Sequence, residues 1–137
     1  NKLSYLLKYD ISIKLTDITT LITNISNSLI QSNYHIKYQT NDHINKYIGC
    51  ELSICTFGHV GDQNIHLNIL LVNELTGWND IEMITIVDEI NDIVYSHVNQ
   101  LNGSISAEHG IGQSKRKYLQ LYKSTNELKL MKSIKEL

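Results

Sequence analysis

The chain has 137 residues, a formal net charge of −2 and 19% charged residues, which is the composition of an ordinary globular domain. This charge balance gives no case for nucleic-acid binding, and no apolar run approaches the length of a membrane span. The chain begins at Asn1 and no signal peptide follows, so we expect a single domain over residues 1–137 that is a piece of a longer protein.

Residues 4–13 alternate weakly between apolar and polar side chains, which predicts a first strand. Thr16 and Asp17 then offer a helix N-cap, and apolar residues follow at helical spacing. The expected buried face of this helix consists of Ile18, Leu21, Ile22, Ile25, Leu29 and Ile30. A second strand is expected over residues 34–38, followed by a polar loop.

Two further strands are predicted over residues 51–57 and 65–72, because apolar side chains alternate along both. Cys50 and Cys55 are five residues apart, and this odd spacing on a strand directs them to opposite faces. We therefore interpret them as small buried or half-buried residues of a reduced compartment, not as a disulfide or a chelating pair.

A long helix is predicted from Trp78-Asn79-Asp80 onward, with Asn79 and Glu82 at capping-box spacing. Its expected buried face consists of Ile81, Ile84, Val87, Ile90, Val94 and Val98. Residues 103–107 are expected to be short and extended, and a final helical stretch runs from Ser114 to the end with a break near Ser124 and Thr125. The order β-α-β-β-α-β plus a helical tail predicts an α+β fold, a ferredoxin-like antiparallel sheet with helices on one face.

The segment 58–68 carries His59 and His66 on either side of a turn expected at residues 62–63. With that turn, the two histidines become cross-strand partners with Cβ atoms about 5 Å apart, and Asn68 extends the same face. Two imidazoles so placed can share a metal ion. A pair of ordinary surface histidines is the alternative, but the glycines on both sides of His59 favour a tight loop that approaches a ligand closely.

The segment 103–112 adds Glu108 and His109 to this inventory. Two histidines and one carboxylate, with open positions for water or substrate, suit a catalytic zinc or a comparable divalent metal. Adjacent residues rarely both ligate one ion, so we expect Glu108 to be the ligand and His109 to be the base beside the metal, because an imidazole readily takes a proton at neutral pH. An ordinary polar loop is the alternative for this pair.

Both segments resemble the C-terminal domain of FAD-linked D-2-hydroxyacid dehydrogenases, a group that includes D-lactate dehydrogenases. Residues 58–68 match Gly-His-x-Gly-Asp-x-Asn-x-His-x-Asn, and residues 103–116 match Gly-Ser-x-Ser-Ala-Glu-His-Gly-x-Gly-x-x-Lys-Arg. Within that group the chain is most similar to D-2-hydroxyglutarate dehydrogenases, because residues 8–12, Lys-Tyr-Asp-Ile-Ser, also match them. The resemblance extends from about residue 5 to the C-terminus.

The resemblance implies a metal ion, usually zinc, with three ligands: His59, His66 and Glu108. It implies three contacts to the substrate: Lys8, Asn68 and His109. It further implies oxidation of D-2-hydroxyglutarate to 2-oxoglutarate, in which the metal lowers the pKa of the hydroxyl, His109 takes its proton as catalytic base, and a hydride passes to FAD.

In that family the flavin-binding domain precedes this region, so the resemblance implies that FAD is bound mainly by a part absent from this chain. The fragment alone is therefore expected to be inactive. The implied partners are a small D-2-hydroxy acid and an electron acceptor such as an electron-transfer flavoprotein, with a homodimer left open. The implied location is mitochondrial for a eukaryotic protein and cytoplasmic otherwise.

Two residues depart from the family pattern. Gln63 replaces a usual glycine, which costs about 1 kcal/mol or more if the position requires a positive φ. Lys14 stands where a proline is usual. Two alternatives stay open: a domain of a dehydrogenase for D-lactate or another D-2-hydroxy acid, and a non-catalytic metal-binding fragment, which Gln63 and the truncated ends would support.

Overall fold

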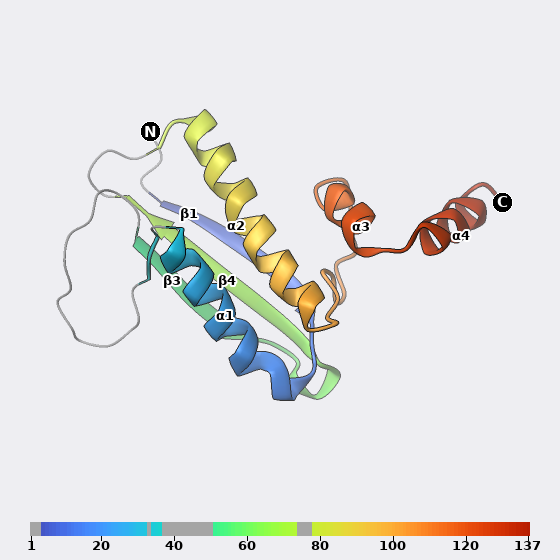
Figure 1. Cartoon of the computed structure of the whole chain (residues 1–137), viewed down its shortest axis with the longest axis horizontal. Helices are drawn as coiled ribbons and strands as arrows, with labels where there is room; N and C mark the ends of the chain where they lie inside the picture. Colours follow the sequence, from blue (N-terminus) through green and yellow to red (C-terminus); the bar gives the residue numbers. More distant parts are fainter. Residues whose placement is uncertain (1–3, 33, 37–50, 74–77) are drawn as a thin grey trace.

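The computed structural model of the chain describes residues 4–32, 34–36, 51–73 and 78–137. Its elements in chain order are β1 (Ser4–Ser12), η1 (Leu15–Asp17), α1 (Ile18–Gln31), β2 (His35–Ile36), β3 (Glu51–Phe57), η2 (Val60–Asp62), β4 (Asn64–Val72), α2 (Asp80–Gln100), α3 (Arg116–Tyr122) and α4 (Thr125–Lys135). Helices α1 and α2 lie over the sheet, and α3 and α4 extend away from it (Figure 1).

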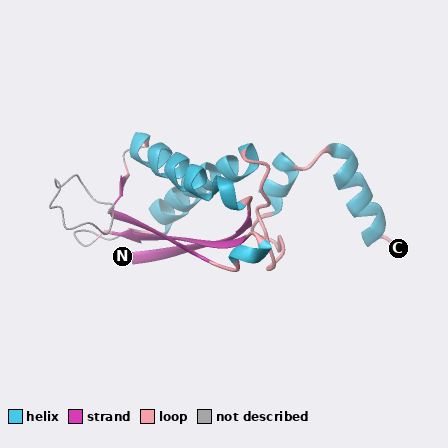
Figure 2. Cartoon of the chain, turned by 90° about the horizontal axis from the view of Figure 1, so that it is seen from below, coloured by secondary structure: helices cyan, strands magenta, loops and turns pink. Residues whose placement is uncertain are grey.

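The four strands form one sheet in the order β1-β4-β3-β2. β4 is antiparallel to both β1 and β3, and the short β2 is parallel to β3. The main helices cover one face of this sheet (Figure 2). The predicted α+β fold, with an antiparallel sheet, helices on one face and a helical tail, is confirmed.

The last predicted strand, over residues 103–107, is reduced to one antiparallel bridge between Ser12 and Ser104 at the edge of β1. Beyond the bridge the chain turns: the Ser104 hydroxyl donates to the carbonyl of Ser106, and the next backbone N–H groups donate to the side chain of Asp10. A strand cannot continue because those N–H groups are not free for a ladder.

The core lies between the sheet and the two long helices. Alternation along β1 and β4 directs one set of apolar side chains toward the helices: Leu7, Tyr9, Ile11, Ile65, Leu67, Ile69 and Leu71. From α1, Leu21, Ile25 and Leu29 are buried as predicted, whereas Ile30 is exposed. Asp17 takes the N-cap position of α1 as predicted, but its side chain makes no capping hydrogen bond.

Helix α2 begins with the predicted capping box, in which the Asn79 side chain accepts from the N–H of Glu82 and the Glu82 side chain accepts from the N–H of Asn79. The predicted burial of Ile81 and Ile84 is wrong, because these side chains are 78% and 64% exposed. Met83 is buried instead, since it lies 11 residues before Val94, about three turns of 3.6 residues. Ile90, Val94 and Val98 are buried as predicted.

The helical tail is broken where the sequence predicted. Helix α3 ends at Tyr122, and Ser124 opens α4 with a second capping box that includes Glu127. No residue of α4 is buried, and this helix extends away from the sheet (Figure 1). Among the described helices, none combines the length and apolar character that a membrane crossing requires.

Three expectations concern residues 34–55. The strand predicted over 34–38 is observed as His35–Ile36, and residues 37–38, the following loop and Cys50 lie outside the described residues. Cys55 is a free thiol, but it is exposed, not buried or half-buried. The reason is its place on the face of β3 that points away from the helices, paired with Asn68 of β4.

Candidate metal and substrate site

The sheet face opposite the helices carries a group of polar side chains. Residues paired across antiparallel strands point to the same side. Lys8 pairs with Asn68, and Asp10 pairs with His66, which also pairs with Phe57 on β3. The strand registers therefore place an amine, a carboxamide, a carboxylate and an imidazole side by side.

The predicted cross-strand pairing of His59 with His66 is wrong. His66 pairs with Phe57, and His59 lies two residues beyond the end of β3. The chain then turns through η2, where the carbonyl of His59 accepts from the N–H groups of Asp62 at 2.9 Å and Asn64 at 3.3 Å. This turn brings His59 back toward His66, with ring centroids 6.4 Å apart.

Two backbone positions make the turn. Gly58 has a φ of +153°, and a Cβ there would overlap the carbonyl oxygen of Asn64, so only glycine fits. Gln63 has a φ of 59°, the left-handed conformation that glycine adopts without strain. The position does require a positive φ, and Gln63 accepts the strain that was expected for it.

The loop after α2 brings Glu108 to the two histidines. Its Oε1 lies 3.5 Å from His66 Nε2, and one donor atom from each of His59, His66 and Glu108 lies within 4.8 Å of the others. Three ligands at about 2.1 Å from a tetrahedral zinc lie roughly 3.4 Å apart, so small side-chain rotations would suffice. Two imidazoles and one carboxylate are thus a donor set that fits the metal ion that the resemblance implies.

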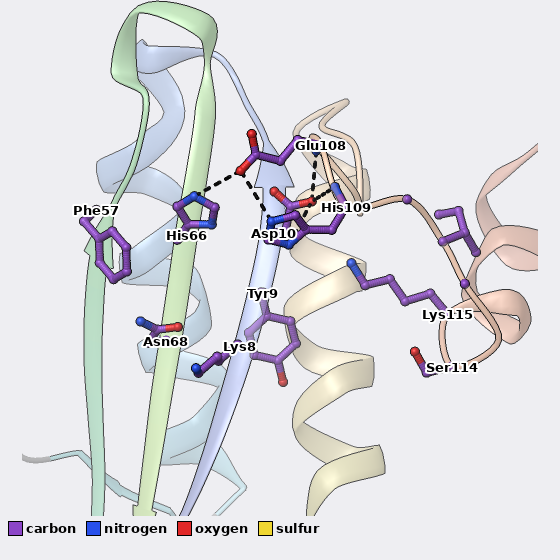
Figure 3. A pocket seen from close by; sticks show the side chains of 13 residues that line it. Lys8, Tyr9, Asp10, Phe57, His66, Asn68, Glu108, His109, Ser114 and Lys115 are labelled. Atoms are coloured by element: carbon purple, nitrogen blue, oxygen red, sulfur yellow. Dashed lines mark hydrogen bonds and ion pairs between the residues drawn. The ribbon is translucent and has the colours of Figure 1, made fainter.

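His109 lies beside this cluster (Figure 3). Its ring stacks on that of His66, with centroids 5.8 Å apart and planes 26° apart, and its Nε2 is 3.4 Å from Glu108 Oε1. The side chain is 65% exposed, so it can reach a molecule in the adjoining cavity. His109 is not one of the three residues whose donor atoms are grouped, and it lies next to them.

Asp10 was not predicted as a site residue. It is buried, and its Oδ2 accepts hydrogen bonds from the backbone N–H groups of Ala107, Glu108 and His109. Burial acts to raise the pKa of Asp10, but these three bonds and the nearby His109 imidazole outweigh it, and the pKa is lowered. The available sequence signal was a carboxylate between two apolar neighbours, Tyr9 and Ile11, in a predicted strand.

An open cavity of about 610 Å³ adjoins the site, a volume within the roughly 300–1,000 Å³ range of small-molecule pockets. It is lined by residues of β1, of β4 and of the loop after α2, including Lys8, His66, Asn68, Glu108, His109 and Lys115. Of the predicted site residues, His59 alone is not among those that line it.

Lys115 was also missed as a cavity residue, because its sequence context, Lys-Arg-Lys, reads as a short basic run. Its Nζ donates to the carbonyl of Ile105 at 3.0 Å. Burial lowers the pKa of Lys115, although the nearby carboxylate of Asp10 acts to raise it. The cavity therefore contains two amines, those of Lys8 and Lys115, which can attract an anionic molecule.

Of the remaining histidines, His97 is outside this site. His97 lies on α2 and its Nε2 hydrogen-bonds the hydroxyl of Ser28 on α1 at 2.8 Å, so it links the two helices. His43 lies outside the described residues, as does the side chain of His35.

Sequence comparisons relate the chain to known proteins. Residues 1–137 match the protein family described as FAD linked oxidases, C-terminal domain. A Stutzerimonas stutzeri protein named D-2-hydroxyglutarate dehydrogenase is 41% identical over 85 residues, which cover 62% of this chain and 18% of that protein. A Danio rerio protein named D-2-hydroxyglutarate dehydrogenase, mitochondrial, is 32% identical over 131 residues, covering 96% of this chain and 20% of that protein.

A Schizosaccharomyces pombe protein named as a mitochondrial D-lactate dehydrogenase is 32% identical over 128 residues, covering 93% of this chain and 21% of that protein. The chain spans about a fifth of the length of these three relatives.

Proposed function

The chain belongs to the family of FAD-linked oxidase C-terminal domains, and on this premise we propose that residues 1–137 form the single substrate- and metal-binding domain of a flavin-dependent D-2-hydroxyglutarate dehydrogenase. The whole protein would oxidise D-2-hydroxyglutarate to 2-oxoglutarate. The observation that carries the proposal is the gathering of His59, His66 and Glu108 around one point, with His109 beside them.

The proposed metal ligands are His59, His66 and Glu108. A bound divalent ion, zinc by donor chemistry, would supply a Lewis acid toward the α-hydroxyl and carboxylate of the substrate. The two imidazoles bind through neutral nitrogens and Glu108 through its carboxylate, so the site offers one negative charge to a doubly charged ion.

The proposed base is His109, which would take the hydroxyl proton at an imidazole nitrogen. Its exposure toward the cavity and its stacking on His66 keep that nitrogen close to any group held at the cluster. FAD, bound mainly by a part of the protein outside this chain, would supply the acceptor for the hydride.

The proposed substrate contacts are Lys8, Asn68 and His109. Lys8 and Asn68 are cross-strand partners, so an amine and a carboxamide face the cavity from adjacent positions. An amine binds a carboxylate, and a carboxamide can donate to it as well. A dicarboxylate therefore has one carboxylate for the metal cluster and a second for Lys8.

A second candidate is a dehydrogenase of D-lactate, favoured by the relative of that name, which covers 93% of the chain. D-lactate has no second carboxylate. In the flavin-containing full-length protein, Lys8→Ala should reduce kcat/KM about 10–100-fold for D-2-hydroxyglutarate and far less for D-lactate, since a charge-assisted bond to a second carboxylate is lost only with the former. Equal losses with both substrates would reject the dicarboxylate assignment.

We also propose an electron-transfer flavoprotein or a similar carrier as the acceptor, and a mitochondrial location if the protein is eukaryotic. The location is supported by the printed name of the Danio rerio relative.

The metal site is tested by zinc analysis of the purified chain. We expect about one zinc ion per chain, and loss of most of it in His59→Ala and His66→Ala, because each removes one of three ligands. His97→Gln is the matched control, since it removes an imidazole that bonds Ser28 far from the cluster, and it should retain the zinc. Absence of zinc from the wild type, or equal zinc in all variants, would reject the site.

A further inference from the structure

We propose that Asp10 is a positioning residue that fixes the loop bearing Glu108 and His109 relative to His66. The inference rests on the proposed function, because it concerns the same site. Asp10 would act through the backbone of the loop, without contact to substrate or metal.

Asp10 lies on the open face of the sheet, yet it is only 4% exposed, because the loop after α2 covers it. A buried carboxylate is costly unless hydrogen bonds replace its water. Its Oδ2 accepts from the N–H groups of Ala107, Glu108 and His109 at 3.1, 3.0 and 2.8 Å, and from the Ser106 hydroxyl at 3.3 Å. The loop tip is thus folded around this carboxylate.

Three successive N–H groups converge on one oxygen only when the backbone curls into a concave turn, a shape that a bound anion stabilises. The side chains of Glu108 and His109 are 47% and 65% exposed, so burial alone does little to orient them. The direction of their backbone, which determines where both side chains point, therefore depends on the anion beneath it.

Asp10 also connects this loop to the strand that carries His66, because the two residues are direct partners in the β1–β4 ladder. One step of the ladder and one hydrogen bond of 3.0 Å join the backbone of His66 to that of Glu108. The 3.5 Å approach between His66 Nε2 and Glu108 Oε1 follows from this short path. Movement of Asp10 would change the separation of the metal ligands directly.

Other contacts hold the loop on either side of its tip, residues 106–109, and the tip itself is bound to Asp10. Ser104 pairs with Ser12, and Lys115 Nζ donates to the carbonyl of Ile105. Gly110 follows the tip with a φ of 75°, where the chain turns back. Residues 106–109 lie between these points, and their described hydrogen bonds to the sheet all end on Asp10.

Asp10→Asn tests the proposal, because asparagine keeps the size but removes the charge, and a neutral carboxamide oxygen accepts hydrogen bonds from the loop N–H groups more weakly than a carboxylate oxygen does. We expect the folded variant to lose hydrogen-exchange protection at residues 107–109 and to bind zinc about 10–100-fold more weakly, the usual cost of losing a group that orients a ligand. Asp88→Asn is the matched control, since Asp88 is exposed and pairs with Lys117 on α3. It should change neither quantity.

Four outcomes decide the proposal. The proposal is overturned if Asp10→Asn retains amide protection and binds zinc within about threefold of wild type. It is also overturned if the variant has a lower melting temperature with unchanged zinc affinity, which indicates a merely structural role.

If the variant does not fold, amide exchange in the wild type decides. Fast exchange at residues 107–109 overturns the proposal, and slow exchange supports it. If the wild type binds no zinc, the proposed function fails, while loss of protection in Asp10→Asn still supports positioning of the loop.

Discussion

Two regions present the side chains of the candidate site, and they are held in different ways. Lys8, His66 and Asn68 project from paired strands whose other face is the apolar core. Glu108 and His109 project from a loop whose tip is bound to Asp10. In the strand region a ladder of backbone bonds fixes each side chain, whereas in the loop region one carboxylate fixes two.

This difference separates the consequences of mutation. On the strands, replacing a polar side chain on the open face removes a function and leaves the ladder intact, because the backbone bonds do not involve side chains. In the loop region, Glu108 and His109 both depend on Asp10 of β1, so replacing that one residue should displace both of them. Many backbone bonds therefore fix the side-chain positions in the strand region, whereas a few bonds to Asp10 fix them in the loop region.

The largest expected effect lies in the hairpin of the strand region. Gly58→Ala should lower the free energy of unfolding by about 3 kcal/mol or more, because the added Cβ overlaps the Asn64 carbonyl and φ is +153°. Chemical denaturation measures this change. Gly61→Ala is the control in the same hairpin, since nothing lies within 4 Å of its added Cβ, and it should cost less than about 1 kcal/mol. Equal losses would contradict the close approach.

A glycine replacement in the loop region should lower the free energy of unfolding less than Gly58→Ala does, but it should weaken zinc binding more. A Cβ on Gly103 would lie 2.7 Å from the Ser12 carbonyl oxygen and 2.9 Å from Val98 Cγ1, so Gly103→Ala should cost about 2 kcal/mol. Because Ser104 pairs with Ser12, the loop should shift and zinc affinity should fall. Gly110→Ala, with a φ of 75° but no atom within 4 Å, is the control and should cost about 1 kcal/mol. Denaturation and zinc titration of both variants decide whether the anchor at Gly103 matters for binding.

The strand region was largely predictable from the sequence. Alternation of apolar residues predicts the strands and puts His66 and Asn68 on one face, and the capping box at Asn79 marks where α2 begins. These signals are local, since each depends on residues a few positions apart. The strand register is harder to predict from neighbouring residues. His59 was expected opposite His66, but the residues of η2 lengthen the turn, so that Phe57 pairs with His66 instead.

For the loop region, the sequence predicted which residues belong to the site but not how they are positioned. Glu108 and His109 were identified by residue type and by resemblance, but their backbone N–H groups donate to Asp10, about a hundred residues earlier in the chain. No periodicity connects residues at that distance. The same limitation explains the strand expected over residues 103–107, because its pattern does not reveal that a buried carboxylate competes with the ladder for the N–H groups.

The smallest expected effect tests whether the hairpin is strained independently of the site. Gln63→Gly should raise the free energy of unfolding by about 0.5–1 kcal/mol, since relief of the positive φ of 59° exceeds the greater chain entropy that glycine adds to the unfolded state. Gln113→Gly is the control, because Gln113 is an exposed loop residue that is not among the positive-φ residues, and it should gain nothing. Thermal unfolding measures both variants. If Gln63→Gly stabilises the chain without changing zinc affinity, the strand region tolerates a local backbone change because its ladder holds His66 in place. A loss of affinity instead would mean that the turn itself positions His59, and the two regions would then depend on single contacts to a similar degree.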